Sequence, residues 1–123
     1  MSAEHLSFIV PGKPQPKQRA RMGKGNRWYT PASTVAFETQ VRNAAFIRMA
    51  TRGVLKEWTG DLHLTVRCYF PDARRRDADN VLKAVQDALN GFVYVDDSQV
   101  VSATVTKAID RDEPRTEVEV VYL

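Results

Sequence analysis

The chain has 123 residues, of which 43% are hydrophobic and 27% charged, with a formal net charge of +3. This length and composition exclude a chain that is disordered as a whole and favour one domain, 1–123, with a core that needs no disulfides. No run reaches the roughly 18 apolar residues of a membrane span, and no leader-like pattern opens the sequence, so we expect a cytoplasmic protein.

The first predicted elements are a strand from Leu6 to Val10 and a basic loop at about 13–27. Proline and glycine without apolar periodicity predict the loop. It is either a solvated connector or an arm that binds the phosphate backbone, and the lack of any acidic residue favours the arm. Its basic residues are Lys13, Lys17, Arg19, Arg21, Lys24 and Arg27.

A short second strand is predicted at 27–29, where packing in the core is the favoured role of Trp28. A helix should follow, with Thr30 as its cap and Pro31 in its first turn, and should run to about 51 before Gly53. One helix face is apolar: Phe37, Val41, Ala44 and Ala45. A second apolar surface, which another subunit could cover, comprises Phe46, Ile47 and Met49.

Residues 61–70 give the clearest strand, because apolar and polar side chains alternate along it. Cys68 falls in the apolar phase, which indicates a small buried residue rather than a reactive thiol. His63 falls in the other phase, away from the acidic residues that follow, and we expect no metal or catalytic role for it.

The next segment is rich in both acidic and basic residues: Asp72-Ala-Arg-Arg-Arg-Asp-Ala-Asp-Asn80. Apolar residues at helical spacing then predict a helix from Val81 to Leu89, which a glycine terminates. Asp77 and Asp79 should therefore lie at the N-terminus of this helix, where backbone N–H groups favour carboxylates. The short return after the helix can bring Asp97 back beside them.

Two further strands are predicted around 101–105 and 118–122, joined by a charged turn at 110–114. The sequence thus predicts an α/β (α+β) fold: a single mixed sheet of about four to five strands with two main helices packed on it. We expect a parallel crossover through the second helix and an antiparallel pair at the end.

Three neighbouring carboxylates repel one another unless a metal ion, a proton or basic groups compensate. Aspartate oxygens suit Mg²⁺, or Mn²⁺ as a substitute, and no cysteine–histidine spacing indicates zinc. Lys83 lies one turn after Asp79 on the same helix face, where it can bind a phosphate or position water. The structural alternative is that the aspartates are helix caps or partners in surface ion pairs. Arg74, Arg75 and Arg76 form a solvated turn or, as we favour, contact phosphates.

The motif Asp77-x-Asp-Asn-x-x-Lys83 followed by Asp96-Asp-x-Gln-Val100 is far more specific than any lone carboxylate pair. In these residues, and in the segments 12–21, 29–31, 71–80 and 87–89, the chain resembles the RusA family of Holliday-junction resolvases, small phage- and prophage-associated endonucleases. The resemblance covers nearly the whole chain.

The resemblance implies that Asp77, Asp79 and Asp97 bind metal and that Lys83 is essential, with Asp96 at a neighbouring acidic position. It also implies a homodimer that acts on branched DNA, the four-way junction. The leading hypothesis is a Mg²⁺-dependent endonuclease that resolves junctions by paired nicks. The alternatives are a non-catalytic DNA-binding module and a nuclease for flaps or forks.

Overall fold

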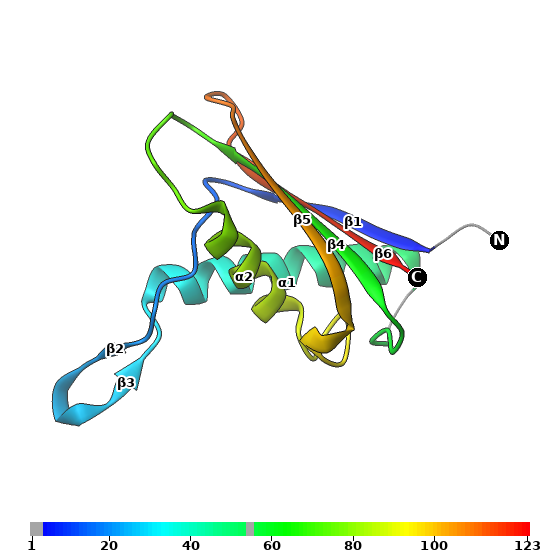
Figure 1. Ribbon diagram of the computed structural model, residues 1–123, viewed down its shortest axis with the longest axis horizontal. Coiled ribbons are helices and arrows are strands. Elements are labelled where there is room, and N and C mark those ends of the chain that lie inside the picture. Colours follow the sequence, from blue (N-terminus) through cyan, green and yellow to red (C-terminus); the bar gives the residue numbers. More distant parts are fainter. Residues whose placement is uncertain (1–3, 54–55) are drawn as a thin grey trace.

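The computed structural model describes residues 4–53 and 56–123, so 1–3 and 54–55 of the predicted domain 1–123 lie outside the described residues. Two helices lie along one face of a four-stranded sheet, and a short hairpin projects from this body (Figure 1). No helix of the described ranges has the length and apolar character needed to span a bilayer. The elements are β1 (His5–Pro11), β2 (Arg21–Met22), η1 (Lys24–Asn26), β3 (Trp28–Tyr29), α1 (Ala32–Arg52), β4 (Leu62–Phe70), α2 (Ala78–Leu89), η2 (Asp97–Gln99), β5 (Val100–Ile109) and β6 (Arg115–Tyr122).

The strand order is β1-β6-β4-β5, a mixed sheet as predicted. The parallel crossover through α2 is confirmed, because β4 and β5 pair in parallel. The predicted antiparallel pairing of the last two strands is wrong, since β6 pairs antiparallel with β4 and β1 instead. Every second residue of β6 is buried, whereas most of β5 is exposed. β6, in which buried and less buried residues alternate regularly, therefore lies inside the sheet, and β5 forms an edge strand.

Helix α1 packs its apolar stripe into the core as predicted: Phe37, Val41 and Ala45 are at most 2% exposed. It ends before Gly53, whose φ of 74° is the left-handed conformation that glycine adopts readily. Thr30 does not cap it, because the N-cap position is Pro31 and no side chain bonds there. Of the predicted second apolar surface, Phe46 and Ile47 are exposed, but Met49 is 5% exposed and belongs to the core.

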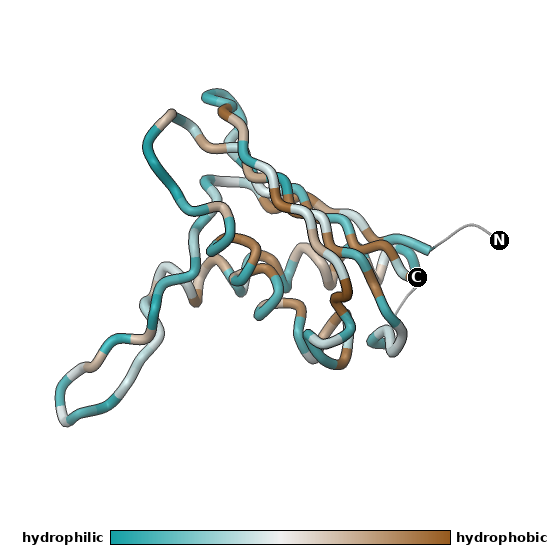
Figure 2. Tube along the Cα trace, in the orientation of Figure 1, coloured by the Kyte–Doolittle hydropathy of each residue, from teal (hydrophilic) through white to brown (hydrophobic). Residues whose placement is uncertain are grey.

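The basic segment is more ordered than the predicted loop, because it contains the β2–β3 hairpin. Packing of Trp28 in the core is wrong: its side chain is 67% exposed, on a two-stranded ribbon with no layer against it. Figure 2 shows hydrophobic residues gathered on the sheet and helices, with largely hydrophilic ones along the hairpin. The base of the hairpin is tied down, since Lys17 N–H donates to the Asn80 carbonyl and Gln18 N–H to Thr34 Oγ1.

The sheet face turned away from the helices carries the polar phase of β4. His63 lies there, with Nδ1 2.6 Å from the Ser102 hydroxyl. Cys68 is 1% exposed on the opposite, covered face, as predicted. Burial raises the pKa of its thiol to about 12, so the thiolate is scarce at neutral pH.

Candidate active site

The N-terminus of α2 is formed as the sequence predicts. Asp77 is the N-cap, and its carboxylate accepts the Asn80 backbone N–H at 3.3 Å and the Asn80 side-chain amide at 3.0 Å. Asp79 lies in the first turn and is exposed. Both carboxylates therefore lie at the positive end of the helix dipole, where acidic side chains stabilise the helix.

A pocket of about 650 Å³ opens at this end of the helix, lined by Arg75, Arg76, Asp77, Ala78, Asp79 and Lys107. Arg76 shapes its rim: the guanidinium binds the Asp72 carboxylate at 2.6 Å and lies 5.0 Å from the centre of the Phe70 ring. Its hydrogen bond holds the pKa of Asp72 down to about 2. Because only 11% of the Arg76 side chain is exposed, it supports the loop, whereas Arg74 and Arg75 are exposed and face solvent.

Asp97 lies near the other end of α2. The Tyr94 hydroxyl is 2.9 Å from both the Asp97 carboxylate and the Gln86 carbonyl, so it donates to one or the other. Burial raises the pKa of Asp97, and the charge of Asp87 beside it acts in the same direction. From Asp79 to Gln86 the helix rises about 10 Å. The prediction that one chain brings Asp97 beside Asp77 and Asp79 is therefore not met.

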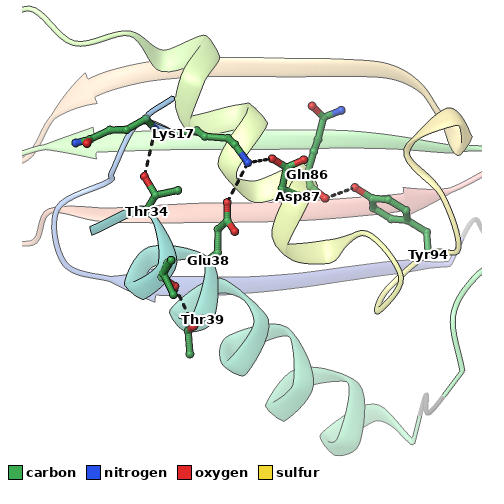
Figure 3. Close-up of polar contacts among 9 residues, drawn as sticks. Lys17, Thr34, Glu38, Thr39, Gln86, Asp87 and Tyr94 are labelled. Carbon is green, nitrogen blue, oxygen red and sulfur yellow. Dashed lines mark hydrogen bonds and ion pairs between the residues drawn. The ribbon is translucent and has the colours of Figure 1, made fainter. Parts of the chain in front are cut away.

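Lys17, predicted as a DNA contact, is instead bound to other side chains. Figure 3 shows its ammonium between Asp87 of α2, to which it donates a hydrogen bond, and Glu38 of α1, 3.5 Å away. The hydrogen bond to Asp87 raises the pKa of Lys17. With the backbone bond to Asn80, this residue fastens the basic segment along α2.

The remaining predicted residues are spread along the same surface. Lys83 is exposed on α2, one turn from Asp79 and one turn from Asp87. Asp96 caps η2, and hydrogen bonds from the Ser98 side chain and from its backbone N–H lower the pKa of Asp96. The other predicted DNA contacts are also exposed: Lys13 shortly after β1, and on or next to the hairpin Arg19, Arg21, Lys24 and Arg27.

The pocket at Asp77 and Asp79 fits Mg²⁺. Its acidic ligands are oxygen donors, and proteins often bind this ion through one or two carboxylates together with waters and phosphate oxygens. Within 4–53 and 56–123, no three acidic, histidine or cysteine side chains are close enough to hold a metal together. A single chain therefore presents two of the three carboxylates that the sequence assigned to the metal.

A larger hollow of about 960 Å³ lies between β1 and α1 and includes Ile9 and Ile47. Neither the predicted aspartates nor Lys83 lines it. Its size does not mark it as the site, because its two acidic residues, Glu117 and Glu119, are not among the predicted metal ligands.

Sequence reasoning missed Lys107, which reaches the Asp77 pocket from β5. The sequence did contain a signal for this residue. Every second residue of β5 from Ala103 to Ile109 lies on the same sheet face as the buried residues of β4, and among these apolar residues Lys107 is charged. A charged residue at such a position indicates either an edge strand or a ligand-binding site.

Comparisons with known proteins place this chain in a family. The family described as Endodeoxyribonuclease RusA matches residues 11–121. The chain is 33% identical over 103 residues to the crossover junction endodeoxyribonuclease RusA of Escherichia coli K12, covering 82% of this chain and 81% of that protein. It is 50% identical over 46 residues to the enzyme of the same name from Enterobacteria phage 82, covering 36% and 38%, respectively. It is 55% identical over 42 residues to the uncharacterized protein YqaN of Bacillus subtilis, covering 34% and 29%. The chain belongs to the RusA family of endodeoxyribonucleases.

Proposed function

We propose that this protein is a Mg²⁺-dependent endonuclease that resolves Holliday junctions by paired, symmetric nicks. The observation that carries the proposal is the pocket at the α2 N-terminus, where Asp77 and Asp79 lie together in a chain of the RusA family. The relatives named crossover junction endodeoxyribonuclease support the four-way junction as substrate. Because such an enzyme must reach the DNA of the cell, the predicted cytoplasmic location remains part of the proposal.

Asp77 and Asp79 would hold the metal ion. When bound, Mg²⁺ supplies a water of lowered pKa and neutralises charge on the phosphate in the transition state. Asn80, which binds the Asp77 carboxylate with its amide, fixes the orientation of that ligand. Lys83 is exposed one turn away, where it would bind a phosphate beside the one that is cut.

The position of Asp97 supports a dimer in which each site uses two chains. A second copy of the chain, related by a two-fold axis, would add its own Asp97 to the Asp77–Asp79 pair of the first. The same rotation builds the second site, because a two-fold interface is reciprocal. Two sites related by this axis match the near two-fold symmetry of a four-way junction and explain paired nicks.

Mixing two inactive variants tests this arrangement. Asp79→Asn and Asp97→Asn should each abolish nicking. Co-folding them yields mixed dimers in which one shared site carries both substitutions and the other carries neither, so single-strand nicking should return. If each site lay within one chain, every site of a mixed dimer would be defective, and no recovery would occur.

The hairpin supports the DNA-binding part of the proposal. It projects from the body with exposed basic residues, and Trp28 and Tyr29 are 67% and 50% exposed. Cations bind the backbone without regard to sequence, and exposed aromatic rings stack on unpaired bases such as those at a branch point.

The deciding experiment compares a mobile four-way junction with duplex, flap and fork DNA, with Mg²⁺ and with chelator. We expect Mg²⁺-dependent, symmetric nicks in the junction that leave ligatable 5′-phosphate ends, and little cutting of duplex. Preferred cutting of flaps or forks would assign the alternative nuclease function. Binding without cutting in Mg²⁺ or Mn²⁺ would identify a DNA-binding module and refute the proposal.

A further inference from the structure

Lys107 reaches the Asp77 pocket by the topology of the sheet. It lies near the end of β5 and pairs in parallel register with Cys68 of β4. Both strands therefore end at the edge from which the chain leaves β4 to enter α2 (Figure 1). Ligands of α/β sheets bind outside the carboxyl ends of parallel strands, so β5 delivers this side chain to the place where a substrate is expected.

The Lys107 ammonium has donors to spare. It donates one hydrogen bond, to the Arg76 carbonyl at 3.3 Å, and an ammonium has three donors. None of the ion pairs formed in the described part of the chain includes Lys107, and its side chain is exposed. Arg76, by contrast, is already bound to Asp72. Lys107 is thus a cation of this pocket that can take an anionic ligand.

Its position differs from that of Lys83, which does not line the pocket. A different role for Lys107 is suggested by its edge strand, because lysines on exposed edges prevent sheet-to-sheet aggregation. That role concerns solubility and predicts no effect on DNA binding.

We propose that Lys107 binds a DNA phosphate in the pocket that Asp77 and Asp79 also line. The inference rests on the proposed function and adds a residue to it. Two carboxylates repel an approaching phosphate, and a lysine in the same pocket provides the compensating charge. Unlike the metal, this charge is part of the chain, so it draws the backbone into the pocket before any metal ion binds.

The test measures binding of a four-way junction in chelator over a series of salt concentrations, for the wild type, Lys107→Gln and Lys107→Arg. One lost phosphate contact should lower the slope of log affinity against log salt by about 0.9 in Lys107→Gln, with about five- to tenfold weaker binding near 0.1 M salt. Lys107→Arg should keep the wild-type slope. Arg67→Gln is the matched control, because it also removes one positive charge but lies in the polar phase of β4, on the sheet face turned away from the helices, and does not line this pocket.

If soluble Lys107→Gln protein keeps the wild-type salt slope, the inference is overturned. The inference also fails if greater aggregation is the sole effect of the substitution. An equal loss in Lys107→Arg or in the Arg67→Gln control overturns it as well. The wild type is assayed for nicking in parallel with Mg²⁺. If it nicks junctions while the Lys107→Gln slope is unchanged, only the role of Lys107 fails; if it nicks nothing, the proposed function fails.

Discussion

Replacing Tyr94 by phenylalanine isolates the hydroxyl that positions Asp97. The ring is 0% exposed, so its burial and packing are the same in both proteins. The hydroxyl donates to Gln86 or to Asp97, each 2.9 Å away. A bond to a neutral carbonyl contributes about 0.5–1.5 kcal/mol and one to a carboxylate about 1.5–3 kcal/mol. Because water partly replaces the hydroxyl at half-buried Asp97, we expect a loss of about 1–2 kcal/mol.

Urea unfolding measures this loss as a lower midpoint at unchanged slope, and thermal unfolding should show a fall of roughly 3–8 °C. A fall in nicking together with the loss of stability would identify Asp97 as the acceptor of the hydroxyl, whereas a loss of stability alone would identify the Gln86 carbonyl. Tyr122→Phe is the control: Tyr122 is 7% exposed and stacks on Trp58, and no described residue hydrogen-bonds to its hydroxyl. A Tyr94→Phe protein as stable and as active as the wild type would refute the reasoning.

Three further outcomes are expected. Asp77→Asn should abolish nicking in Mg²⁺ and leave the unfolding free energy within about 0.5 kcal/mol, because asparagine caps a helix as well as aspartate; a loss of fold would contradict this. Lys17→Met should cost about 0.5–1 kcal/mol at pH 8 in urea unfolding. The folded pKa of Lys17 is raised above the usual value of about 10.4, so its contribution is complete below that pH and is lost as pH rises through the folded pKa; a cost that does not fall as the pH is raised would count against the ion pair. Cys68 should resist thiol reagents at pH 8 and react fully in denaturant, and rapid labelling of the native protein would show that it is not buried.

The features that the sequence predicted correctly depend on residues that are close together in the chain. The cap at Asp77, the end of α1 at Gly53 and the burial of Cys68 follow from local preferences and alternation, and all three are observed. The failures concern residues distant in sequence. Insertion of β6 between β1 and β4 depends on which strand buries more surface. The exposure of Trp28 depends on the absence of a layer over the hairpin.

The site shows the same division. Asp77 and Asp79 share a helix end, so the sequence predicted their proximity. Asp97 was expected to join them, but α2 has 12 residues and is about 18 Å long, and Asp97 is fixed by Tyr94 near its far end. Lys107 is 28 residues from Asp79 and comes to the pocket only through the parallel pairing of β5 with β4.

In the proposed dimer, the separation of Asp79 from Asp97 along α2 would make activity depend on protein abundance. If each site needs carboxylates from two chains, a chain without a partner cannot cut DNA. At low abundance, cleavage then rises with the square of the protein concentration, and it becomes linear once pairing is complete. The expression level would then determine whether DNA is cut: at few copies the chains stay unpaired, and a burst of synthesis allows active dimers to form.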